Sequence, residues 1–289
     1  MNKEKNLYKG IKPFMSCTDH SVSQESYELL FNEEFEMMVT LPVPSDLEKY
    51  YKSEDYISHT DASKSIVDKI YQRVRKHTLQ KKLALINSFH STEKKLLDIG
   101  SGTGDFLATC KKNHWSVFGV EPNENAIAIS KRKGIGVISD ISILKENEFD
   151  VITLWHVLEH VENLVEYIEV LKNKLKPNGT LVIAVPNYKS FDANYYKEFW
   201  AAYDVPRHLW HFSQNSIKRL FENVSMIVEK TIPMKYDSYY VSMLSEKYKS
   251  GSTNFLKAFY IGFLSNRKAK STSEYSSLIY VIKNTENTI

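Results

Sequence analysis

The sequence predicts an α/β protein in which a mostly parallel sheet is covered by helices on both faces. Three observations lead to this prediction. The middle of the chain alternates short apolar runs with amphipathic segments, joined by short connections. Runs such as VITLW and TLVIAV are hydrophobic throughout, which is typical of strands buried on both faces. The first run enters the turn GSGTG, with glycine at every second position.

Each predicted element has its own signal. The apolar runs predict strands, in chain order, over 95–100, 115–121, 135–138, 149–154, 180–185, 226–232 and 276–283. Helices are predicted between them, near 104–113, 123–132, 162–175 and 213–223. The helix over 162–175 has the clearest pattern, because Leu164, Ile168 and Leu171 recur at helical spacing and KPNG follows. A longer helical pattern covers 63–89.

We expect two parts along the chain. Residues 1–85 would form an N-terminal extension and helix, a cap, and residues 86–289 the α/β domain. Residues 1–60 are expected to be irregular. Two aromatic-rich segments, 187–212 and 235–275, interrupt the alternation and are expected to be insertions outside the sheet.

Composition limits the partners. The net charge is only +3, so nothing requires a nucleic acid or an anionic membrane. The lysines and arginines of the 63–89 helix lack interleaved aromatic residues, so we interpret them as a solvated face rather than an RNA site. No apolar run reaches the ~20 residues of a membrane span, and no signal peptide is recognisable. With two distant cysteines, a cytoplasmic setting is the simplest expectation. The oligomeric state stays open.

The glycine turn predicts a ligand site at the carboxyl edge of the sheet. Asp98 lies in the first strand, Glu121 ends the second and Asp140 follows the third. An acid in the position of Glu121 can accept both hydroxyls of a ribose. Asp105 stands where a dinucleotide turn needs its third glycine, and an acidic rim favours a cationic ligand over a pyrophosphate. S-adenosylmethionine, an adenosine that carries a sulfonium, meets these requirements.

The segments DIGSGTGDFL, FGVEPN, ISDIS, FDVITLWHVLEHV and LKPNGTLVIAVPN, in this order and spacing, resemble the class I S-adenosylmethionine-dependent methyltransferases. The resemblance covers roughly residues 86–190. HVLEHV followed by PRHLWHFS resembles the small-molecule branch that includes quinone-ring and sugar methyltransferases. It implies a Rossmann-like sheet of seven strands, the last antiparallel. The cofactor-binding residues it suggests are Asp98, Gly100, Ser101, Gly102, Gly104, Glu121, Pro122, Asp140, Ile141 and His156.

The segment FDANYYKEFWAAYDVPRHLWHFS, residues 191–213, predicts the pocket for a small-molecule acceptor, because it joins aromatic walls to titratable groups. Histidine suits a general base near neutral pH, so His208 and His211 are the candidates, with Asp204 as an orienting partner. Trp200, Tyr203 and Arg207 are predicted to bind the acceptor.

No metal is predicted. HVLEH, residues 156–160, matches an inverted zinc-protease signature, but it directly follows a strand instead of lying in a long helix. Glu159 and His160 are expected to organise this loop. Cys17 and His20 give C-x-x-H without a second pair, so four zinc ligands cannot be assembled.

Three alternatives to a methyltransferase stay open. They are a nucleotide-dependent oxidoreductase on a similar sheet, a non-catalytic relative that binds the cofactor, and the zinc hydrolase that HVLEH suggests. The missing third glycine disfavours the first, and the retained glycines and Glu121 disfavour the second. The sequence does not reveal the acceptor, or whether oxygen, carbon or nitrogen is methylated.

Overall fold

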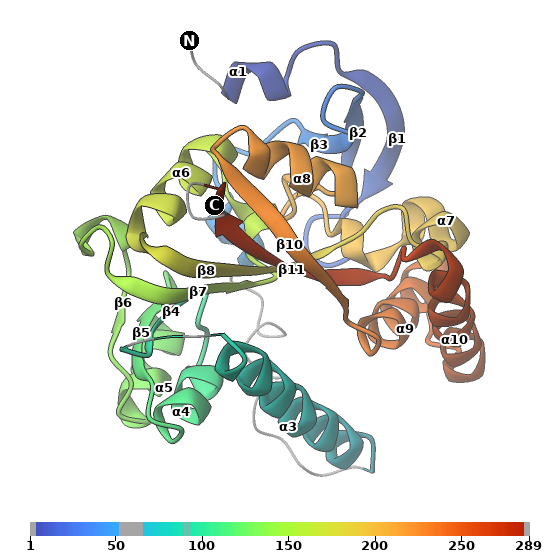
Figure 1. The fold of residues 1–289 in the computed structure, drawn as a ribbon. Helices are drawn as coiled ribbons and strands as arrows, with labels where there is room; N and C mark the ends of the chain where they lie inside the picture. Colours follow the sequence, from blue (N-terminus) through green and yellow to red (C-terminus); the bar gives the residue numbers. More distant parts are fainter. Residues whose placement is uncertain (1–3, 52–65, 90, 92, 286–289) are drawn as a thin grey trace. The chain divides into compact units, whose positions relative to one another are not determined.

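The computed structural model describes residues 4–51, 66–89, 91 and 93–285, and the structural statements below concern these residues (Figure 1). The chain divides into two compact units. One unit comprises residues 1–51, 156–169 and 183–282, and the other 52–155, 170–182 and 283–289. We call them the outer-segment unit and the central unit and describe each separately.

The central unit contains the predicted alternation of strands and helices. Its elements are α3 (Ile66–Asn87), β4 (Lys95–Ile99), α4 (Asp105–Lys111), β5 (Ser116–Val120), α5 (Glu124–Arg132), β6 (Val137–Ile138) and β7 (Phe149–Trp155). Strand β4 pairs in parallel with both β5 and β7, and β5 pairs in parallel with β6. Side chains of β4 and β7 are buried almost throughout, as expected for strands covered on both faces.

The complete sheet has seven strands, in the order β10-β11-β8-β7-β4-β5-β6. Strand β8 (Leu175–Pro186) and helix α6 (Leu164–Lys174) both run across the division between the units. Strands β10 (Met226–Pro233) and β11 (Ser277–Asn284) complete the sheet. The predicted seven-stranded, mostly parallel, Rossmann-like architecture is confirmed.

The outer-segment unit contains a second sheet that the sequence analysis missed. Strands β1 (Lys12–Thr18), β2 (Ser26–Asn32), β3 (Met37–Leu41) and β9 (Trp210–His211) form a four-stranded antiparallel sheet. The expectation that residues 1–60 are irregular is therefore wrong for most of the described part, and residues 187–212 do contribute a short strand. Alternate side chains of β2, including Tyr27 and Leu29, are buried, so the pattern was that of a half-buried strand.

The remaining elements of this unit are mostly helical. They are α1 (Glu4–Leu7), α7 (Phe191–Tyr196), α8 (Gln214–Glu222), α9 (Asp237–Ser250) and α10 (Phe255–Thr272). Ser213 and Ser216 form a capping box that starts α8. Helices α9 and α10 form a helical hairpin, and residues 235–275 contain no strand, as expected. Within the described residues, no helix is both long enough and apolar enough to cross a membrane.

Candidate functional site

The glycine turn lies between β4 and α4, at the carboxyl edge of the central strands. The backbone amides of Gly100 and Ser101 donate to the carbonyl oxygen of Val120, at 2.8 and 3.1 Å. Gly104 has a φ of 76°, and a β-carbon there would lie 2.8 Å from Ser130 Oγ, so packing requires glycine. Gly102 has a φ of 52°, but a β-carbon there would meet nothing within 4 Å. Its backbone therefore faces open space that a ligand can enter.

Glu121 follows β5 and is joined to this turn. Its Oε2 accepts from the backbone amide of Gly102 at 2.8 Å, and its Oε1 from that of Asn123 at 3.0 Å. The side chain is buried. Each carboxylate oxygen can accept more than one hydrogen bond, so the geometry leaves acceptor capacity for further donors. The exposed Pro122 comes next in the chain.

The two other predicted acids differ from Glu121. Asp98 is enclosed within the sheet, and its Oδ1 accepts from Thr153 Oγ1 at 2.6 Å. Burial raises the pKa of Asp98 to about 7 despite this bond. Asp140 follows β6, where it accepts from the amide of Ser142 at 2.8 Å, beside the buried Ile141. Hydrogen bonds from Ser142 lower the pKa of Asp140, which therefore stays ionised.

This edge of the central unit fits the nucleoside part of S-adenosylmethionine. Ser101 Oγ is buried and has no hydrogen-bond partner among the described residues. Gly102, the next residue of the turn, has open space beside its backbone and donates its amide to Glu121. The side chains at this edge include the carboxylates of Glu121 and Asp140, which favour a cationic ligand. The assignment of each residue of this edge to the cofactor stays a prediction.

His156 belongs to the other unit, and its predicted contact with the cofactor stays a prediction. It has a φ of 58°, and its ring lies between two carboxylates. Nδ1 is 3.3 Å from Glu159 Oε1, and Nε2 is 3.1 Å from Asp237 Oδ2. Burial alone would lower the pKa of His156, but these bonds raise it to about 10, so the ring is an imidazolium at neutral pH. The two carboxylates already neutralise its charge.

The HVLEH segment is not a helical metal motif, because residues 158–160 form a single 3₁₀ turn. His160 contacts the Arg207 carbonyl oxygen and Tyr51 Oη through Nδ1, at 2.9 and 3.0 Å. Burial and the neighbouring His208 lower the pKa of His160 to about 4. The expectation that Glu159 and His160 organise the loop agrees with these contacts, since the Glu159 carbonyl also accepts from the Leu209 amide at 2.8 Å.

Glu159, His160 and His208 form a cluster that the sequence analysis did not foresee. One ligand atom from each lies within 4.8 Å of the others, so the three side chains could hold a metal ion. Glu159 Oε2 is buried without a hydrogen-bond partner among the described residues. The motifs HVLEH and PRHLWH could both be recognised in the sequence, but only the folded structure shows that their side chains lie close together. The prediction that no metal is bound stays a prediction.

The three predicted catalytic residues lie close together. Asp204 Oδ1 pairs with Arg207 at 2.5 Å, and Asp204 Oδ2 lies 3.6 Å from His208 Nε2. His208 Nδ1 is 2.9 Å from the Ala202 carbonyl oxygen, which fixes the proton on Nδ1. His211 differs, because its Nε2 is 2.8 Å from Thr40 Oγ1 and burial lowers its pKa to about 3.

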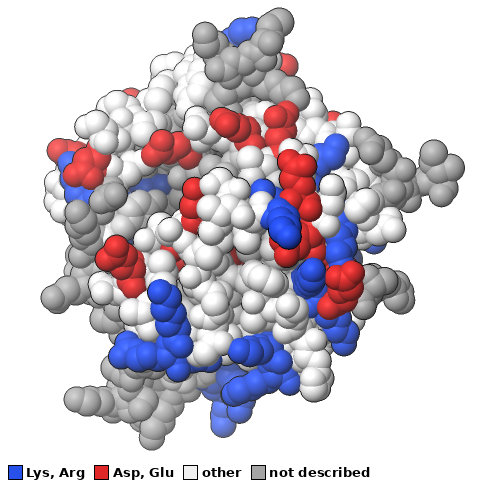
Figure 2. Space-filling model, turned by 90° about the vertical axis from the view of Figure 1, so that its left-hand side faces the viewer, with Lys and Arg blue, Asp and Glu red and all other residues white. Residues whose placement is uncertain are grey.

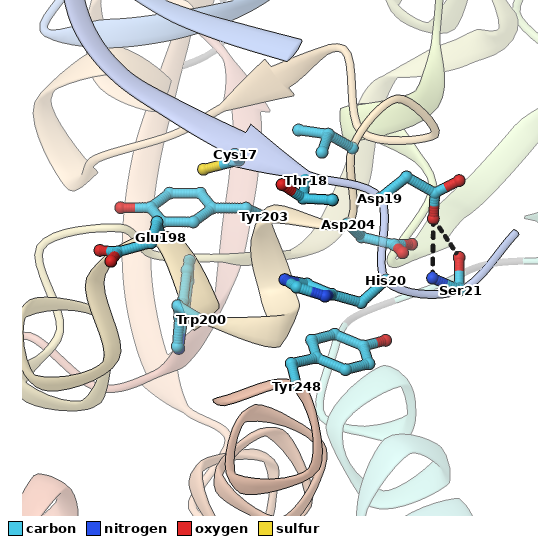
Figure 3. Close-up of a pocket in the computed structure, with 11 residues that line it drawn as sticks. Cys17, Thr18, Asp19, His20, Ser21, Glu198, Trp200, Tyr203, Asp204 and Tyr248 are labelled. Carbon is cyan, nitrogen blue, oxygen red and sulfur yellow. Dashed lines mark hydrogen bonds between the residues drawn. The ribbon is translucent and has the colours of Figure 1, made fainter. Parts of the chain in front are cut away.

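Trp200 and Tyr203 are both buried in a core cluster. Figure 3 shows them with Asp204 around a small cavity, together with Cys17, His20 and Tyr248. Its volume of about 10 Å³ suits a single water molecule and no ring compound. Trp200 Nε1 donates to Asp192 at 2.8 Å. The roles of Trp200, Tyr203 and Arg207 in acceptor binding stay predictions.

A larger groove of about 450 Å³ lies in the same unit and shares Tyr203 with the small cavity. Its other lining residues are Phe14, Met15, Tyr188, Lys189, Ala193, Asn194, Lys197 and Glu274. This volume falls in the range of small-molecule sites. The residues Phe14 and Met15 come from β1, so sequence reasoning, which expected no structure there, could not include them.

The face drawn in Figure 2 carries acidic and basic side chains interspersed, with basic residues gathered toward its lower edge. Such a mixture agrees with the small net charge of the chain. The expectation that no nucleic acid binds stays a prediction.

The fold is that of an α/β protein in which the glycine turn and Glu121 lie together at the carboxyl edge of the central strands. A sequence profile described as "Methyltransferase domain" matches residues 71–225, which is more than half of the chain. The chain therefore belongs to this family, and the predicted resemblance is confirmed.

One curated relative is the ubiquinone biosynthesis O-methyltransferase of Rickettsia canadensis (strain McKiel). It is 32% identical over 150 residues, covering 49% of this chain and 63% of that protein. The chain thus matches less than two thirds of this relative's length.

Two solved structures share the fold. A SAM-dependent methyltransferase from Archaeoglobus fulgidus has a TM-score of 0.51 at 20% identity, covering 73% of this chain and 94% of that one. Magnesium protoporphyrin IX methyltransferase from Synechocystis PCC 6803 has a TM-score of 0.52 at 15% identity, covering 78% and 90%. At these identities the likeness concerns the fold alone.

Proposed function

We propose that this protein is an S-adenosylmethionine-dependent methyltransferase that acts on a hydroxyl group of a small molecule. The hydrogen bond from the Gly102 amide to Glu121 carries the proposal, because it joins the acid that we propose to bind the ribose to the glycine turn. Membership of the methyltransferase family supports it. The Rickettsia relative is named as an O-methyltransferase, which favours oxygen as the acceptor atom.

In this proposal the cofactor supplies an electrophilic methyl group on a sulfonium. Glu121 accepts the ribose hydroxyls, and the open backbone at Gly102 receives the amino-acid end. Asp140, which follows β6, contacts the adenine in this proposal. The main task of the chain is to hold the acceptor oxygen about 3–3.5 Å from the methyl carbon and in line with the bond that breaks.

His208 is the stronger of the two candidate bases. His211 has a pKa of about 3, and its Nε2 already contacts Thr40, so it is a poor proton acceptor at neutral pH. His208 keeps its proton on Nδ1, and a proton taken up at Nε2 would lie beside the Asp204 carboxylate. Asp204 is itself held by Arg207. We propose that His208 removes the hydroxyl proton and that Asp204 stabilises the resulting imidazolium.

We also propose that the protein works in the cytoplasm. Cys17 and Cys110 are both free, buried thiols, which suits a reducing cytoplasm. A small-molecule acceptor agrees with the 450 Å³ groove that Tyr203 and two β1 residues help to line.

Calorimetric titration with S-adenosylmethionine tests the cofactor site. Wild-type protein should bind it, and Glu121→Gln should weaken the affinity by roughly 10- to 100-fold, since the variant loses the negative charge and replaces one of the two acceptor oxygens with an amide donor. Glu146→Gln is the matched control, an exposed acid of the same unit, and should bind like wild type. Equal affinity of the Glu121 variant would remove the assignment.

Turnover of small hydroxylated aromatic compounds, followed by release of S-adenosylhomocysteine, tests the base. His208→Asn should reduce turnover by about 10²-fold and leave the affinity for S-adenosylmethionine unchanged. The exposed His114 gives the control His114→Asn, which should keep full turnover. A His208 variant as active as this control would discard His208 as the base.

A further inference from the structure

Helix α10 exposes its bulky apolar residues, whereas an ordinary surface helix buries them against the protein. The side that faces the protein consists mainly of small residues, namely Ala258, Ile261, Gly262, Ser265 and Ala269. The opposite side carries bulky apolar residues that are between 47% and 86% exposed. They are Phe255, Leu256, Phe259, Tyr260 and Phe263, and we call them the aromatic face.

The close contact between α9 and α10 fixes this orientation (Figure 1). Ser238 Oγ of α9 donates to the Gly262 carbonyl oxygen of α10 at 3.1 Å. A β-carbon at Gly262 would lie 2.8 Å from the Tyr239 ring. Because only small residues fit at this contact, α10 cannot rotate to bury its large side chains.

A single exposed apolar side chain is ordinary, but a continuous set over successive turns of one helix marks an interaction surface. Phe255, Phe259 and Phe263 follow each other at a spacing of four residues, and Leu256 and Tyr260 lie beside them. Tyr239 of α9 extends the aromatic face, with its ring centroid 5.0 Å from that of Phe259. The exposed apolar surface of the aromatic face does not stabilise the unit itself, because burial of apolar surface, not its exposure, is favourable.

The charges of the helical hairpin are predominantly positive. Residues 235–272 contain seven lysines and arginines and only two acids, in a chain whose total net charge is +3. Both acids are paired inside the unit, Asp237 with His156 and Glu246 with Lys257. Arg267 and Lys270 are exposed and continue the row of Tyr260 and Phe263 along the helix. The helical hairpin therefore offers apolar contact and positive charge together.

We propose that the aromatic face of α10 docks on the surface of a bilayer that contains anionic phospholipids. Aromatic and aliphatic side chains enter the interface between headgroups and acyl chains, while neighbouring lysines and arginines pair with lipid phosphates. A second copy of this chain fits less well, because an isologous contact would bring two positively charged hairpins together. A convex helix also offers no groove to a protein segment, whereas a bilayer needs no complementary shape. The inference does not depend on methyl transfer.

Co-sedimentation of the full chain with vesicles tests the proposal. Wild-type protein should bind vesicles of phosphatidylcholine and phosphatidylglycerol, much less those of phosphatidylcholine alone, and binding should weaken as salt is added. The double variant Leu256→Ser with Phe259→Ser should reduce the partition coefficient by about tenfold or more, as the inserted area is lost. Ile227→Ser, an exposed apolar residue of β10, is the matched control and should bind like wild type.

A second pair of variants separates charge from apolar contact. Arg267→Glu with Lys270→Glu should abolish the preference for phosphatidylglycerol, whereas Lys218→Glu with Lys230→Glu, exposed elsewhere in the unit, should preserve it. The proposal is overturned if wild-type protein stays in the supernatant with both kinds of vesicle. It is equally overturned if light scattering shows a dimer that Phe259→Ser dissociates, since the aromatic face would then bind a second copy.

Discussion

His156 shows how two carboxylates determine the charge of one histidine. Asp237 and Glu159 raise its pKa to about 10, and the pKa of Glu159 is correspondingly lowered to about 2 in spite of burial. The folded protein thus binds the His156 proton more tightly than the unfolded chain does, where the ordinary value is 6.5. The stabilisation that results is complete below about pH 6.5 and is lost as the pH rises towards 10.

Urea unfolding of wild type and His156→Gln at several pH values should reveal this linkage. The wild type should exceed the variant by about 2 kcal/mol in free energy of unfolding near pH 6, and the difference should shrink towards pH 10. Glu159 remains ionised over this range, so His156 alone accounts for the change. The exposed control His114→Gln should show no such trend. A difference that grows with pH would contradict the charge assigned to His156.

The position of a single residue could be predicted where its neighbours belong to a local motif. Gly102 and Glu121 follow from one turn and the end of the next strand, and parallel pairing of β4 with β5 brings them together. The cluster of Glu159 with His208 was not predictable, because its members come from segments that meet only in the folded unit. The contact of His211 with Thr40 depends on a strand that was not expected at all.

At the scale of elements, the antiparallel sheet of β1–β3 and β9 was the main omission. Its strands are short, and β1 and β2 each carry an exposed charged residue, Lys12 and Glu28, so composition suggested irregular chain. The turn between β1 and β2 is held by Asp19, whose carboxylate accepts from the amides of Ser21 and Ser23 at 2.8 and 2.7 Å. DHSVS was therefore a turn signal between two strands.

The contact between α9 and α10 gives a prediction for these elements. Gly262→Val should lower the free energy of unfolding by about 3 kcal/mol, because its branched side chain would meet the Ser238 carbonyl and Tyr239, which the helix backbone holds in place. Gly136→Val is the matched control, since a β-carbon there meets nothing within 4 Å. Thermal or urea unfolding measures both. If Gly262→Val is as stable as this control, the helices do not approach as closely as described.

At the scale of the whole molecule, the alternation of strands and helices predicted a parallel sheet but not the full order of its strands. Helical connections favour parallel neighbours, as β4, β5 and β6 are, whereas β7 follows β6 in the chain and lies on the other side of β4. The division into two units was not foreseeable, because it depends on contacts made by three separate stretches of the chain. The predicted boundary at residue 85 stays a prediction.

Binding of the cofactor should stabilise the folded chain as a whole. At about 100 times its Kd, S-adenosylmethionine should add about 2.7 kcal/mol, which raises the Tm of a chain of this size by roughly 5 °C. Thermal unfolding with and without ligand measures the shift, and Glu121→Gln should lose most of it. NADH is the comparison ligand. A shift with NADH and none with S-adenosylmethionine would favour the oxidoreductase alternative.

Thr40 connects the first strands of the chain to the segment that carries His208 and His211. Its amide donates to the Leu209 carbonyl at 2.9 Å, and its hydroxyl donates to the His208 carbonyl at 2.7 Å. The ribosome thus completes β3 about 170 residues before it makes the segment that Thr40 contacts. During synthesis β3 must therefore wait for this segment. In evolution, an exchange of the first fifty residues between related chains would exchange the support of these histidines as well.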